Sequence, residues 1–116
     1  MNFVYVFIGG GLGSILRYSI SLLISRFAVH FPISTLISNF LATLFVVIFS
    51  FILLKKTDFT WIQPLFIIGF CGGFSTFSTF SLETATFLQS GNYLLALINV
   101  VLSVFLCIGL VFFFNK

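Results

Sequence analysis

Long apolar runs separated by short polar connections fill almost the whole chain. A transmembrane helix takes roughly 20 apolar residues, and four runs reach that length: Phe3–Phe27, Ser34–Leu54, Ile62–Leu88 and Tyr93–Phe114. The run Leu44–Leu54 does not alternate polar and apolar positions, as a strand of a membrane β-barrel would. The pattern therefore predicts an all-α membrane protein with four transmembrane helices, in which residues 1–116 form a single domain.

The composition agrees with a chain that is surrounded by membrane lipid. Only 6% of the 116 residues are charged and 60% are hydrophobic, whereas a soluble domain gives about a quarter of its positions to charge. A net charge of +3, from five Lys/Arg and two Asp/Glu, is too small for a phosphate-binding surface. We therefore expect no nucleic-acid partner.

Residues that carry enzymatic or metal chemistry are scarce. With one His and two carboxylates in separate segments, one chain cannot assemble a catalytic triad or a carboxylate pair. Cys71 and Cys107 fall inside predicted spans, where a structural disulfide is uncommon, and neither has a His or carboxylate at metal-ligand spacing. The sequence predicts that the protein is not an enzyme.

Basic residues are divided only weakly between the two sides of the membrane. With four crossings, Lys55, Lys56 and Lys116 share the side of the N-terminus, and Arg26 lies on the other side, with Arg17 if it reaches that interface. This small bias under the positive-inside rule allows two interpretations. The N-terminus lies in the cytoplasm, or the chain inserts in both orientations and two copies pair antiparallel.

Small and polar residues interrupt the first, second and fourth spans. Gly9 and Gly13 form a small-xxx-small pair, which predicts close contact between helix backbones. Thr35 with Asn39, and Asn99 with Ser103, are each one turn apart and so share a helix face. Since a polar group buried in lipid needs a partner, these residues either bond neighbouring helices or face a pore or ligand. Cys107 continues the face of Asn99 and Ser103, and Arg17 must reach an interface or line a wet cavity.

The third span contains the most unusual string, GFCGGFSTFSTFSLE over Gly69–Glu83. Its glycines and alternating Ser/Thr predict a broken helix, and free backbone groups at such a break commonly face ions. Phe77 and Phe80 lie at i and i+3, so their rings share a face, and the positive ring edges favour an anion. The alternative is that Phe77 and Phe80 only face lipid, since a chain with 19 Phe produces such spacings by chance. The neighbouring polar residues Ser75, Ser78 and Thr79 favour a pathway instead.

This string closely resembles the signature of the Fluc-type (CrcB) fluoride channels. The glycine-rich opening with Arg17-Tyr18, the segment Thr35–Asn39 and the chain length extend the resemblance over nearly the whole chain. Proteins of that family are antiparallel, dual-topology homodimers with two fluoride pathways and a structural sodium ion at the dimer centre. The resemblance implies a channel in the cell membrane of a prokaryote that passively exports fluoride and confers fluoride resistance.

The resemblance also implies roles for particular residues. The backbone carbonyls of Gly72 and Ser75 from both subunits would hold the sodium ion. In the candidate fluoride pathway, Asn39 would be the amide donor, Phe77 and Phe80 the pore-lining rings, and Ser103 part of the polar track. Arg17 would be the basic residue near the aqueous vestibule. The remaining polar lining would be Glu83, Thr35 and Thr79.

Three positions depart from the family pattern. Ser75 stands where threonine is usual, which is harmless if only its carbonyl binds sodium. Asn99 stands where tyrosine is expected, and Cys107 where a small residue, often serine, is expected. Asn99 can replace a hydroxyl in the fourth-span polar track, but a thiol is a poor donor. These substitutions are compatible with a heterodimer of two paralogues, so the sequence leaves homodimer and heterodimer open.

A small four-helix, proton-coupled multidrug or guanidinium exporter is the competing function. Such exporters are also antiparallel dimers of about this size, but their mechanism needs a carboxylate in the first span. The first span here contains no acid, so the sequence favours the fluoride channel.

Overall fold

The computed structural model describes residues 2–27, 32–55 and 60–114, so Lys56 and Lys116 of the orientation prediction lie outside the described residues. The elements follow in the order α1 (Asn2–Ser25), α2 (Ile33–Lys55), the π-helical η1 (Gln63–Cys71), α3 (Gly72–Phe74), α4 (Phe77–Gln89) and α5 (Tyr93–Phe114). All described elements are helical.

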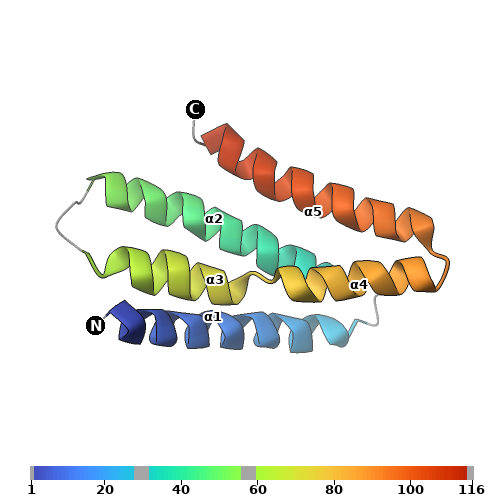
Figure 1. The fold of residues 1–116 in the computed structure, drawn as a ribbon, viewed down its shortest axis with the longest axis horizontal. Coiled ribbons are helices and arrows are strands. Elements are labelled where there is room, and N and C mark those ends of the chain that lie inside the picture. The colour runs from blue at the N-terminus through green and yellow to red at the C-terminus, as the bar shows by residue number, and fades with distance from the viewer. Residues whose placement is uncertain (1, 28–31, 56–59, 115–116) are drawn as a thin grey trace.

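Four segments of the described chain are long and apolar enough to cross a membrane: Asn2–Ser25, Ile33–Leu53, Gln63–Gln89 and Tyr93–Phe114. They match the four predicted spans closely. The chain runs back and forth along one direction, so that α1 begins and α5 ends in the half of the molecule that holds the end of α2 and α3 (Figure 1). This is the four-crossing topology that the apolar runs predicted.

Helix α1 lies directly against the backbone of η1 and α3 because its glycines have no side chain. A Cβ added at Gly9 would collide with Leu65 O and approach Phe70 N to 2.8 Å. One added at Gly13 would collide with Phe70 O and approach Phe74 N to 2.8 Å. The predicted close packing through Gly9 and Gly13 is therefore confirmed.

Aromatic rings fill the space between α2 and the first half of the third span. Phe49 and Phe66 stack with ring centroids 4.5 Å apart, and Phe45 meets Phe70 edge-on at 5.6 Å. Phe74 at the end of α3 is completely buried. These contacts hold the end of α3 firmly, immediately before the chain leaves the helix.

The third span is broken at two residues. Ser75 (φ −82°, ψ 155°) and Thr76 (φ −150°, ψ 117°) are extended, and helical structure resumes at Phe77 as α4. Beyond the break, α4 packs against α5, while α2 packs against both η1 and α5. The break between α3 and α4 is visible near the middle of the molecule (Figure 1), where the glycine-rich string predicted it.

Candidate functional site

Asn39, in the first half of α2, binds the broken segment with its side-chain amide. Its Nδ2 donates to Thr76 O at 3.3 Å, and its Oδ1 accepts from Thr76 N at 2.7 Å. In a continuous helix these two backbone groups would be satisfied within the helix. The Asn39 amide replaces those bonds, so it bonds a neighbouring segment, which was one of the two alternatives left open for it.

The break releases the carbonyls of Gly72 and Ser75 from their usual helical partners. Thr76 N, the i+4 donor for Gly72 O, is bound to Asn39. Thr79 N, the i+4 donor for Ser75 O, donates instead to Thr76 Oγ1 at 3.2 Å, which caps α4. Gly72 is exposed on the surface of this chain. Carbonyls freed in this way suit a monovalent cation.

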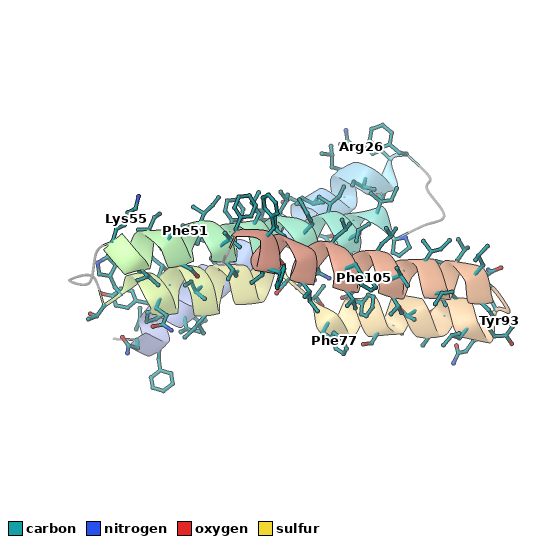
Figure 2. All side chains as sticks on the ribbon, turned by 90° about the horizontal axis from the view of Figure 1, so that it is seen from above. Arg26, Phe51, Lys55, Phe77, Tyr93 and Phe105 are labelled. Carbon is teal, nitrogen blue, oxygen red and sulfur yellow. The ribbon has the colours of Figure 1, made fainter. Side chains whose placement is uncertain are left out.

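A cavity of about 250 Å³, here called the phenylalanine cavity, lies on one side of the break. It is lined by Asn39 and Thr43 of α2, Ser75 and Thr76 of the break, Phe77 and Phe80 of α4, and Ser103, Val104 and Cys107 of α5. The rings of Phe77 and Phe80 lie 5.6 Å apart, as their shared face predicted. Phe77 is 79% exposed in the single chain, at the start of α4 (Figure 2).

A second, more polar cavity of about 120 Å³ lies between α1, α2 and α4. This polar cavity is lined by Arg17, Tyr18 and Ser21 of α1, Ser34, Thr35 and Ser38 of α2, Thr76 of the break, and Thr79 and Glu83 of α4. Thr35 Oγ1 donates to Glu83 Oε2 at 3.0 Å. Arg17 Nε donates to Gly73 O at 3.2 Å, another carbonyl beside the break. Arg17 thus lines a cavity, half-buried, which agrees with one of the two positions considered for it.

Thr76 is the residue common to the linings of both cavities. Its hydroxyl donates to Thr79 Oγ1 at 3.2 Å and lies 3.1 Å from Ser78 Oγ. Each residue of the predicted pathway lines one cavity or the other. Sequence reasoning did not select Thr76, although it belongs to the polar string, because its shared position depends on where the helix breaks.

The structure separates Asn99 from Ser103 and Cys107, the residues predicted to share one face of the fourth span. Ser103 and Cys107 line the phenylalanine cavity, but Asn99 lines neither cavity. Asn99 is 2% exposed and donates through Nδ2 to Thr84 Oγ1 at 3.0 Å, and Thr84 in turn donates to Phe80 O at 2.8 Å. Asn99 therefore ties α5 to α4 through Thr84, and its place in the polar track stays a prediction. Thr84 is a second residue that sequence reasoning missed.

Four candidate spans, a broken third helix and two cavities lined largely by hydroxyl, amide and phenyl groups are typical of a small helical membrane transport protein. The chain belongs to the CrcB family, since the family model described as "CrcB-like protein, Camphor Resistance (CrcB)" matches residues 4–114. The resemblance inferred from the third-span string is thereby confirmed, and with it the prediction that the chain is not an enzyme.

Proteins named fluoride-specific ion channel FluC are similar over most of the chain. The one from Coxiella burnetii (strain CbuK_Q154) is 43% identical over 113 residues, which cover 94% of this chain and 90% of that relative. The one from Serratia proteamaculans (strain 568) is 46% identical over 102 residues, covering 84% and 78%. The one from Pyrococcus abyssi (strain GE5 / Orsay) is 43% identical over 106 residues, covering 90% and 85%.

Proposed function

We propose that this protein is a fluoride-selective channel that passively exports fluoride across a prokaryotic cell membrane and so lowers cytoplasmic fluoride. The observation that carries the proposal is that two cavities lie beside the break in the third span and that Thr76 of the break lines both of them. Hydroxyl and amide donors and phenyl rings line these cavities, together with Arg17 and Glu83 in the polar cavity. The relatives named as fluoride-specific channels, 43–46% identical, support the same function.

Fluoride is small and strongly hydrated, so a narrow pathway must replace its water with other donors. Of the two N–H groups of Asn39 Nδ2, one donates to Thr76 O, which leaves the second for the anion. The hydroxyls of Thr79 and Ser103 and the ring edges of Phe77 and Phe80 supply further positive groups. Several moderate sites in series let the ion leave as well as enter.

The functional unit is an antiparallel dimer, either of two identical chains or of this chain with a paralogue. In the single chain the phenylalanine cavity is bounded by Phe77, whose side chain is 79% exposed, and a second copy would cover that ring. The carbonyls of Gly72 and Ser75, released at the break, would hold a sodium ion between the two subunits. When bound, such a cation raises the local potential for an anion and links the subunits.

Reconstituted protein should release fluoride rapidly from liposomes loaded with potassium fluoride once valinomycin supplies a potassium shunt. Chloride should be poorly conducted under the same conditions, and protein-free vesicles give the background. A fluoride electrode measures the efflux. Efflux no faster than from protein-free vesicles, including when any paralogue from the same source is co-expressed, would refute the channel function.

Replacing Phe80 by isoleucine should lower fluoride efflux roughly tenfold while dimer assembly persists. Isoleucine retains apolar bulk but has no positive ring edge, and the loss of about 1.4 kcal/mol at one site corresponds to that factor. Phe105→Ile is the matched control because Phe105 is 72% exposed on α5 and lines neither cavity (Figure 2). Equal efflux from Phe80→Ile and Phe105→Ile would refute a contribution of the Phe80 ring edge to fluoride conduction.

A further inference from the structure

Helix α4 carries both rings of the phenylalanine cavity, yet apolar packing holds it only weakly. Phe77 and Phe80 lie near its start, and no residue of α4 is buried in the single chain. Among the described elements, α4 packs chiefly against α5. Because lipid tails are as apolar as leucine, contacts between helices in a membrane depend on close packing and on interhelical hydrogen bonds. The orientation of the two rings therefore depends on the hydrogen bonds that α4 makes to other helices.

Helix α5 supplies one such bond close to the phenylalanine cavity. Asn99 Nδ2 donates to Thr84 Oγ1 at 3.0 Å, and the Thr84 hydroxyl donates to Phe80 O at 2.8 Å. Asn99 is 2% exposed, so little water competes for its amide, and hydrogen bonds in series strengthen one another where the dielectric is low. Two hydrogen bonds thus connect α5, through Thr84, to the backbone of Phe80.

The bond between Asn99 and Thr84 also sets the register of the two helices. Helices α4 and α5 run in opposite directions on either side of the connection at residues 90–92 (Figure 1). Residues four apart share a helix face, so one turn from the bonded pair toward the break lie Phe80 on α4 and Ser103 on α5. Both of these residues line the phenylalanine cavity. The bonded pair therefore determines which part of α5 lies beside the Phe80 ring.

The remaining buried face of α5 offers little else that would fix this register. It consists of Ala96, Asn99 and Ser103, whose spacing places them along one face of the helix. Small side chains let two helices approach closely, but they lack the bulk to interlock with the neighbouring helix. Of these three residues, Asn99 is the one that bonds α4.

We propose that Asn99 and Thr84 are positioning residues for conduction, which hold the Phe80 ring at the phenylalanine cavity by fixing the rotation and register of α4 on α5. Neither residue lines either cavity, and the role requires no contact with the anion because it acts through the backbone of Phe80. The consequence for conduction rests on the proposed function, whereas the placement of the ring does not.

Fluorine NMR of protein that carries 4-fluorophenylalanine in place of Phe80 tests the placement without any transport. We expect one signal without further substitution and several signals, or one shifted signal, in both Thr84→Val and Asn99→Leu, which keep the branched side chain but lose the bond. Thr84→Ser should restore the original signal. Thr86→Val is the matched control, because the Thr86 hydroxyl makes the same bond within α4, to Leu82 O at 2.8 Å, on an exposed face.

An unchanged signal in Thr84→Val, or a change that Thr86→Val reproduces, would overturn the proposal. A change in Thr84→Val that an assembled Asn99→Leu protein does not share would overturn it as well. Size-exclusion chromatography establishes which variants assemble as the wild type does. Thr84→Val, with its serine and Thr86 controls, decides the matter by itself if Asn99→Leu does not assemble.

Fluoride efflux from liposomes tests the consequence for conduction. Thr84→Val and Asn99→Leu should each slow efflux roughly fivefold, the factor that corresponds to one interhelical hydrogen bond of about 1 kcal/mol, whereas Thr86→Val should conduct like the wild type. In the Phe80→Ile background neither substitution should slow efflux further, because no ring remains to be positioned.

The Phe80→Ile background also separates positioning from direct contact with the anion. If Asn99 were itself a donor in the pathway, Asn99→Leu would lower efflux by the same factor with or without the ring, and that result would refute the positioning role. Absence of efflux from the wild type would instead refute the channel function, and fluorine NMR would still decide whether Asn99 and Thr84 place the ring.

Discussion

Replacing Asn39 by alanine should reduce fluoride efflux on the order of 100-fold. The substitution removes both hydrogen bonds to Thr76, at Nδ2 and Oδ1, together with the N–H proposed to bind fluoride. Two buried hydrogen bonds of about 1–1.5 kcal/mol each account for that factor. The liposome efflux assay measures the effect, and efflux within about twofold of the wild type would contradict the role given to Asn39.

Asn39→Asp separates the structural role of Asn39 from its role as a donor. The aspartate keeps an oxygen that accepts from Thr76 N, but it has no N–H and its negative charge repels an anion. We expect this variant to elute as the same oligomer as the wild type in size-exclusion chromatography and to conduct almost no fluoride. Efflux from Asn39→Asp close to the wild-type rate would exclude an amide donor at this position.

Replacing Gly13 by alanine should destabilise the protein by about 1–3 kcal/mol, the usual cost of overpacking. The new Cβ collides with Phe70 O and approaches Phe74 N, and backbone atoms cannot rotate away as a side chain can. Helix α1 must therefore separate from the segment that precedes the break. Thermal unfolding of the purified protein in detergent, followed by circular dichroism, measures the change.

Gly11→Ala is the matched control for this prediction. A Cβ at Gly11 meets no atom within 4 Å, although it lies on the same helix and gains the same helix propensity. Alanine is favoured over glycine inside a helix by about 0.5–1 kcal/mol, so Gly11→Ala should be neutral or slightly more stable. Equal melting temperatures for Gly11→Ala and Gly13→Ala would show that the close backbone contact of α1 does not limit stability.

The positions of the spans could be predicted from local sequence alone, for a physical reason. Backbone groups in lipid must be satisfied within their own segment, so a sufficiently long apolar run has to be a helix. The predicted span Tyr93–Phe114 coincides with α5, and the predicted third span ends within one residue of Gln89, the end of α4. The break in the third span could also be predicted from local sequence, because glycines and hydroxyl side chains are concentrated in the string Gly69–Glu83.

The candidate pathway was predictable only in part. The resemblance to the CrcB family selected Asn39, Phe77, Phe80 and Ser103, and the structure brings these four to one cavity. Spacing also placed Asn99 and Ser103 on one face of the fourth span. It did not show that Asn99 turns to Thr84 behind Phe80, because the rotation of a helix against its neighbour depends on the packing of both.

The sequence by itself thus determined that the protein crosses a membrane four times, where its third helix breaks, and which family it resembles. Only the tertiary structure decided that Thr76 lines two cavities, that Asn39 replaces the lost backbone bonds, and that Ser38 shares a cavity with Glu83. The first set depends on neighbours along the chain. The second depends on pairs some 37 to 45 residues apart, which meet only when the helices pack.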